Sequence, residues 1–191
     1  FVARLLHSSS AIGVQLDSLA DVITSGLAPA AVLWQVCLQT EPCWLPETWK
    51  LGYGVFVLAA FSALRLAKFN IDETQTVEFC GLPPPAGSLL CASLGMLWQQ
   101  GMLALSSDGV LLIAVLTSLL LVSPIRMFAL KFHGFGWRGN EVRYLFLLAS
   151  IVLIIILRTY AIPVIIVLYI VVSAVRWLCM HSGNPDKAPK A

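Results

Sequence analysis

Residues 142–179 read VRYLFLLASIVLIIILRTYAIPVIIVLYIVVSAVRWLC, and this stretch decides the class of fold. It contains two apolar runs, 142–157 and 162–179, which are separated only by a short segment around Arg158, Thr159 and Tyr160. Apolar runs of this length are typical of membrane-spanning helices, because lipid offers the backbone no hydrogen-bond partner outside a helix. The short connection leaves room only for a tight turn, so we expect two antiparallel transmembrane helices.

Four further apolar segments precede this pair, at residues 10–38, 50–69, 86–105 and 109–123. Over the whole chain of 191 residues, 59% are apolar and only 12% are charged, and the mean hydropathy is +0.86. This composition excludes a soluble globule, a disordered chain and a secreted disulfide scaffold. The sequence predicts an all-α fold, a polytopic bundle of about six transmembrane helices. We expect residues 1–180 to form this membrane domain and residues 181–191 a cytoplasmic tail.

The basic residues are distributed unequally between the two predicted membrane faces. Ten of the 12 Lys and Arg residues fall on the side that holds both chain ends, and only Lys50 and Arg158 fall on the other. Because basic residues favour the cytoplasmic side, we expect both ends and the connections 70–85 and 126–141 to face the cytosol. The net charge of +2 is too small to indicate a nucleic-acid partner.

Gly13, Asp17 and Asp21 recur every four residues in the first predicted helix and therefore share one helical face. A charged side chain inside a membrane segment costs about 2.5–3.5 kcal/mol on insertion scales, so such residues are candidates for function. Carboxylates are ligands for Mg²⁺ or Mn²⁺, and glycine leaves the backbone open to a ligand. Two carboxylates make an incomplete site, which substrate phosphates and water would complete.

Two other interpretations of the aspartates remain open at this point. The pair is also typical of a solvated cap near the N-terminal end of a helix, where the helix dipole favours negative charge. In a small transporter, Asp17 and Asp21 would instead relay protons or bind cations. Divalent-independent transport would identify that alternative.

The residues Ala3-Arg4, Gly13, Asp17 and Asp21 have the spacing A-R-x8-G-x3-D-x3-D. This pattern resembles the second half of the signature of the CDP-alcohol phosphatidyltransferase family, D-x-x-D-G-x-x-A-R-x8-G-x3-D-x3-D. Phe1 and Val2 stand where the signature has two residues between D-G and A-R. We therefore expect the chain to begin directly after a D-x-x-D-G segment.

Four further stretches resemble the membrane-embedded bacterial branch of that family, which makes phosphatidylserine. They are LDSLAD at 16–21, GLAPA at 26–30, RLAKFN at 65–70 and FCGLPPPA at 79–86. The resemblance implies that CDP-diacylglycerol and L-serine are the substrates, that CMP is released and that Mg²⁺ or Mn²⁺ is the cofactor. It also implies a homodimer in the bacterial inner membrane. Lys68 and Pro84 depart from the pattern of many members.

The resemblance also implies roles for single residues. Asp17 and the aspartates of the expected preceding segment would bind metal, and Asp21 would take the proton from the serine hydroxyl and ligate a second metal. Ala3 and Gly13 would lie where the nucleotide approaches, and Arg4 would contact phosphate. Arg4 also fits a cytosolic anchor that reaches the membrane surface.

The carboxylate of serine requires a cation in its pocket. Arg65 is the first candidate, Arg126 is the second, and Asn70 with the loop 81–83 would line the same mouth. Both arginines also fit basic residues at the cytosolic ends of helices. Another acceptor of the same family, glycerol phosphate or inositol phosphate, would require more basic residues in this cavity.

Overall fold

The computed structural model describes residues 11–43, 52–71, 78–128 and 140–182, and Ala3 and Arg4 lie outside these ranges. In the described part the first long helical segment comprises α2 (Ala11–Val22), the π-helix η1 (Ile23–Leu27) and α3 (Ala28–Gln39). The 3₁₀ turn η2 (Gly52–Phe56) leads into α5 (Val57–Ile71). The remaining elements are β1 (Glu78–Cys80), α6 (Pro84–Gln99), α7 (Ser107–Val122), β2 (Arg126–Phe128), α8 (Glu141–Leu157), η3 (Arg158–Tyr160) and α9 (Ala161–Ser182).

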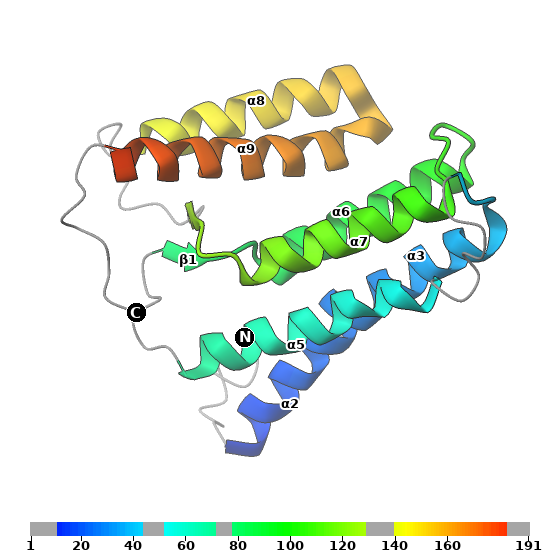
Figure 1. Ribbon diagram of the computed structural model, residues 1–191. Coiled ribbons are helices and arrows are strands. Elements are labelled where there is room, and N and C mark those ends of the chain that lie inside the picture. Colours follow the sequence, from blue (N-terminus) through cyan, green and yellow to red (C-terminus); the bar gives the residue numbers. More distant parts are fainter. Residues whose placement is uncertain (1–10, 44–51, 72–77, 129–139, 183–191) are drawn as a thin grey trace.

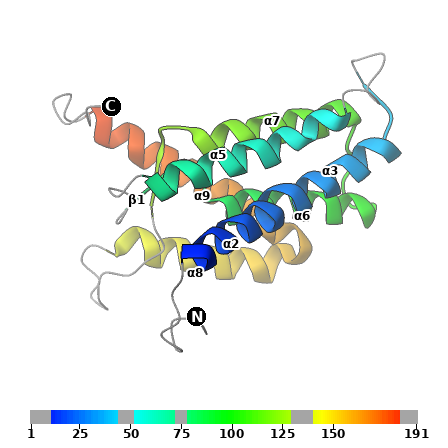
Figure 2. The ribbon, with the colours of Figure 1, turned by 90° about the horizontal axis from the view of Figure 1, so that it is seen from below.

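The helices lie side by side as a bundle, which confirms the predicted all-α class (Figure 1). α3 packs on α6 and α7, α5 packs on α7, and α9 packs on α6 and α8. α8 and α9 form the expected hairpin, whose turn contains Arg158 at a φ of 48°. α2, α3 and α5 lie along the lower part of the bundle in Figure 1 and therefore face the viewer in the view from below (Figure 2).

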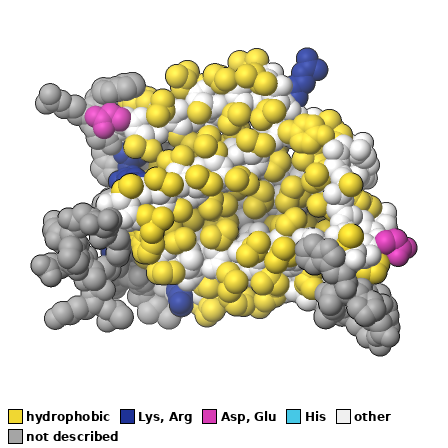
Figure 3. Space-filling view, turned by 45° about the horizontal axis from the view of Figure 1, so that its top comes forward, with side chains coloured by type: hydrophobic (Ala, Val, Ile, Leu, Met, Phe, Trp, Pro, Cys, Tyr) yellow, Lys and Arg dark blue, Asp and Glu magenta, His cyan; other side chains and the backbone are white. Residues whose placement is uncertain are grey.

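Hydrophobic side chains cover the middle of the visible face, and the charged side chains visible there lie toward its ends (Figure 3). Among the described residues, three helical stretches are long and apolar enough to cross a membrane, namely Gln15–Gln39, Gly52–Asn70 and Glu141–Cys179. The last stretch spans the α8–α9 hairpin. The protein is therefore an integral membrane protein, whereas six separate membrane crossings remain a prediction.

The core combines large aliphatic side chains with small residues at helix contacts. Leu33, Leu58 and Leu121 are buried at its centre. A Cβ added to Gly26 would lie 2.9 Å from Ser62 Cβ and 3.1 Å from Ala59 Cα, so η1 approaches the backbone of α5 closely. Small residues allow such close contacts between membrane helices, where burial from lipid provides little driving force.

Two features of the fold differ from the sequence-based expectations. The third predicted segment, 86–105, ends as a helix at Gln99, because the chain turns through Gly101 at a φ of +68°. In addition, β1 and β2 form a short antiparallel ladder in which Cys80 is opposite Arg126. Gly81 follows β1 at a φ of +76°, and it donates its N–H to the carbonyl of Ile125 over 2.9 Å.

Candidate functional site

The predicted acidic face lies on α2. Gly13, Asp17 and Asp21 are all exposed, and their four-residue spacing places them along one side of the helix. Each step of four residues rises about 6 Å, so a ligand that reaches one carboxylate also reaches the next. The helix therefore presents two carboxylates and a bare stretch of backbone to the surroundings.

The geometry of α2 also depends on the π-helix that follows it. Thr24 in η1 donates its hydroxyl to the carbonyl of Ala20 over 2.9 Å. Two residues later, Gly26 makes the close approach to α5 described above. π-helical turns inside α-helices are frequent near functional sites, and this one begins at Ile23, two residues after Asp21. The sequence analysis did not predict the π-helix, although Thr24, Ser25 and Gly26 mark a polar interruption in an apolar segment.

Asn70 connects α5 to the acidic face. Its Nδ2 donates a hydrogen bond to Ser18 Oγ over 3.1 Å, and both side chains lie toward solvent or lipid. Ser18 is three residues from Asp21 and is therefore its neighbour on the surface of α2. The structure thus brings one of the predicted serine-binding residues to the predicted carboxylates.

Arg65 occupies a different side of α5. Five residues separate it from Asn70, which corresponds to about 140° around a helix. Arg65 is only 5% exposed, and its guanidinium carbon lies 5.4 Å from the centre of the Phe69 ring. Cys80 in β1 and Tyr169 in α9 lie near it. Asn70 therefore lies on the side of α5 that faces α2, whereas Arg65 lies on the side nearer to the ladder of β1 and β2.

Arg126 begins β2 and is exposed. The Cα atoms of Arg126 and Cys80 are paired in the ladder, and Arg65 lies near Cys80, so both arginines lie in the neighbourhood of the same strand residue. The ladder joins segments that are more than forty residues apart in the chain. The ladder therefore brings Arg126 to the neighbourhood of Arg65.

The donor set on α2 fits a magnesium or manganese ion that also binds substrate phosphates. Within the described ranges, no cluster of three or more His, Cys, Asp or Glu side chains is placed to hold a metal. Mg²⁺ is commonly held by one or two carboxylates, with water and phosphate oxygens as its other ligands. Asp17 and Asp21 provide such a pair on an open face.

Tyr169 is a residue near the site that the sequence analysis missed. Its hydroxyl donates to the carbonyl oxygen of Phe128, the last residue of β2, over 3.0 Å. One signal was available in the sequence, since a tyrosine within an apolar helix usually finds a hydrogen-bond partner for its hydroxyl. The identity of that partner depends on tertiary packing.

Comparison with known proteins gives consistent matches. A family profile described as CDP-alcohol phosphatidyltransferase matches residues 1–131. A Mycobacterium tuberculosis protein named CDP-diacylglycerol-serine O-phosphatidyltransferase is 34% identical over 99% of this chain and 68% of its own length. Proteins of the same name from Helicobacter pylori and Bacillus subtilis are 30% and 32% identical, and the matches cover 93% and 69% of this chain and 72% and 67% of the relatives.

Proposed function

The chain belongs to the CDP-alcohol phosphatidyltransferase family, and on that basis we propose that it transfers the phosphatidyl group of CDP-diacylglycerol to the hydroxyl of L-serine. The products are phosphatidylserine and CMP. The observation that carries this proposal is the match, along nearly the whole chain, to the Mycobacterium tuberculosis protein named CDP-diacylglycerol-serine O-phosphatidyltransferase. The exposed acidic face of α2 lies within the part of the chain that the family profile covers.

Asp17 and Asp21 would hold the divalent cation, Mg²⁺ or Mn²⁺. When bound, this cation offsets the negative charge of the diphosphate. The serine Oγ forms a bond to the phosphorus of the phosphatidyl group, and the bond from that phosphorus to the bridging oxygen breaks, so that CMP leaves. Asp21 accepts the proton of the serine hydroxyl, because a carboxylate within reach of the attacking oxygen acts as a general base.

Nucleotide binding is assigned to the same face. Gly13 lies one helical turn before Asp17 and leaves the backbone open to the cytidine nucleotide. Ala3 and Arg4 would also bind the nucleotide, because of their place in the family signature, and Arg4 would contact phosphate. Arg65, Asn70 and Arg126 would bind serine, the arginines through its carboxylate.

We also propose that the protein lies in a bacterial inner membrane as a homodimer, with the active site facing the cytosol. The bias of the basic residues supports this orientation. CDP-diacylglycerol would leave its acyl chains in the lipid beside α2, whose Ile12, Leu16 and Leu19 are exposed. The nucleotide would then meet the acidic face at the membrane surface.

The test is CMP release by the full-length enzyme in vesicles that contain CDP-diacylglycerol and Mg²⁺. We expect release to depend on L-serine and the lipid product to be phosphatidylserine. Glycerol 3-phosphate and inositol phosphate are the competing acceptors. Release that depends on one of them instead of serine contradicts the proposed acceptor, and transport without CMP release contradicts the proposed reaction.

A further inference from the structure

Tyr169 lies in α9, outside the residues that the family profile matches, yet it contacts the ladder beside the predicted acceptor site. The side chain is 8% exposed, and its hydroxyl donates to Phe128 O over 3.0 Å. Phe128 ends β2, which Arg126 begins. The hydrogen bond therefore attaches one end of this three-residue strand to a membrane helix.

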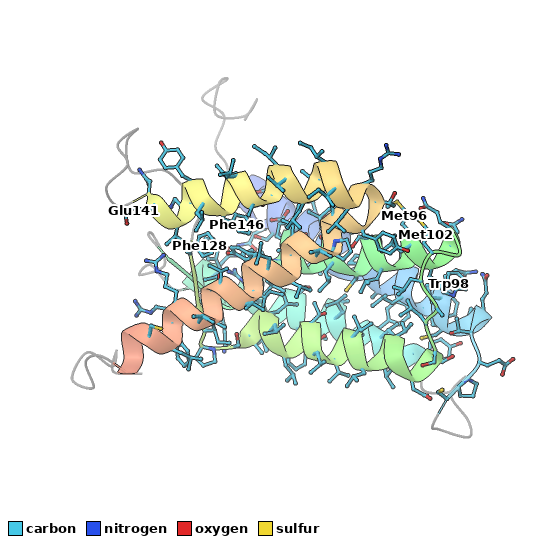
Figure 4. The ribbon with its side chains drawn as sticks, turned by 90° about the horizontal axis from the view of Figure 1, so that it is seen from above. Met96, Trp98, Met102, Phe128, Glu141 and Phe146 are labelled. Atoms are coloured by element: carbon cyan, nitrogen blue, oxygen red, sulfur yellow. The ribbon has the colours of Figure 1, made fainter. Side chains whose placement is uncertain are left out.

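Aromatic packing holds the same contact in place. The ring centroids of Phe128 and Tyr169 are 5.0 Å apart, and Phe146 in α8 lies 5.7 Å from Phe128 and 5.9 Å from Tyr169. Figure 4 shows Phe128 and Phe146 close together, well away from Met96, Trp98 and Met102. Because the rings fix the position of Tyr169, its hydroxyl has a defined direction toward the strand.

Tyr169 is also connected to the buried arginine. Arg65 lies near Tyr169 and Cys80, and Cys80 is paired with Arg126 across the ladder. The Phe69 ring also lies against Arg65, with its centre 5.4 Å from the guanidinium carbon. Tyr169 thus contacts the strand that contains Arg126 and lies near Arg65.

We propose that Tyr169 is a positioning residue for the acceptor pocket, which anchors β2 and orients the two arginines that bind the serine carboxylate. This inference rests on the proposed function. It gives the C-terminal helix hairpin a role in acceptor binding, while the nucleotide lipid is bound through α2. Loss of the hydroxyl therefore weakens serine binding selectively.

The test compares Tyr169→Phe with Tyr160→Phe in the full-length enzyme. Tyr160 is a matched control, because its hydroxyl also donates to a backbone carbonyl, that of Met102, over 2.7 Å. Tyr160 belongs to the α8–α9 turn, at the end of the hairpin opposite to β2. We expect Tyr169→Phe to raise the KM for serine about fivefold, the effect of one lost hydrogen bond. The KM for CDP-diacylglycerol should stay near that of the wild type, and Tyr160→Phe should change neither constant.

A double-mutant cycle with Arg65→Lys tests whether Tyr169 acts through Arg65. We expect the two effects on the serine KM to be non-additive, because coupled residues in one network do not contribute independently. Equal changes in both KM values, the same profile in Tyr160→Phe or additive effects in the cycle would overturn the inference. KM does not depend on the fraction of enzyme that is folded, so a lower yield of the variant does not obscure the comparison.

The wild-type assay separates this inference from the proposed function. If another alcohol supports CMP release and serine does not, the proposed acceptor is wrong, and the KM for that alcohol then tests Tyr169. An unchanged acceptor KM in Tyr169→Phe, with an active serine-dependent wild type, contradicts the role of Tyr169 alone. Absence of CMP release with every alcohol contradicts both.

Discussion

Asn70 at the end of α5 donates a hydrogen bond from Nδ2 to Ser18 Oγ on α2, over 3.1 Å. Ser18 neighbours Asp21 on the helix surface, so this bond connects the proposed general base to the helix that also contains Arg65. Gly26 in η1, the segment that continues α2, also approaches α5 closely and provides a second contact. The relative position of the acidic face and the acceptor residues therefore depends on the α2–α5 contact.

Asn70→Ala is expected to reduce kcat/KM for serine by a few fold. The lost hydrogen bond is exposed, and such bonds contribute about 0.5–1.5 kcal/mol. Ser18→Ala removes the other partner of the same bond. In a double-mutant cycle, the two substitutions should be non-additive if Asn70 acts through Ser18. Additive losses would show that the hydrogen bond to Ser18 does not contribute to the role of Asn70 in serine binding.

Asp21→Asn is expected to lower kcat for CMP release by about 10²–10⁴-fold, because the amide cannot accept the proton of the serine hydroxyl. Glu41→Gln is the matched control, since Glu41 is an exposed carboxylate after the end of α3 and lies outside the proposed site. The control should keep the wild-type rate. An active Asp21→Asn variant would show that another group is the base.

Asp17→Asn is expected to raise the Mg²⁺ or Mn²⁺ concentration needed for half-maximal activity by about 10- to 100-fold or more, since even outer-shell changes have effects of this size. Metal binding to the folded protein also raises its melting temperature. Addition of Mn²⁺ should therefore raise the melting temperature of the wild type and of Glu41→Gln, and do so much less for Asp17→Asn. Equal shifts in all of these proteins would contradict a metal site at Asp17.

Gly26→Ala is expected to destabilise the bundle by about 1–3 kcal/mol, the usual cost of overpacking. The new Cβ would lie 3.1 Å from the Cα of Ala59, so backbone has to move. Gly52→Ala is the control, because its Cβ would meet Cys37 Cβ at an ordinary 3.6 Å. Thermal unfolding in detergent measures the difference. A melting temperature of Gly26→Ala no lower than that of Gly52→Ala would show that the close approach of η1 to α5 is not needed for stability.

Local features of the sequence predicted the helices and the acidic face well. Apolar runs determine where membrane helices form, and the 3.6-residue repeat places Gly13, Asp17 and Asp21 on one side of α2. The end of α6 was predicted too late, at residue 105 rather than Gln99. The run of apolar residues continues past the point at which Gly101 adopts a left-handed conformation and ends the helix.

The sequence by itself determined the membrane class, the family signature and the carboxylate pair, because each is a matter of composition or of spacing over a few helical turns. Only the tertiary structure decided that Asn70 meets α2, that Arg65 instead lies near the ladder and that Tyr169 anchors β2. The two hydrogen bonds join residues that are 41 and 52 positions apart in the chain. They depend on how the helices pack against one another, and no local pattern in the sequence encodes that arrangement.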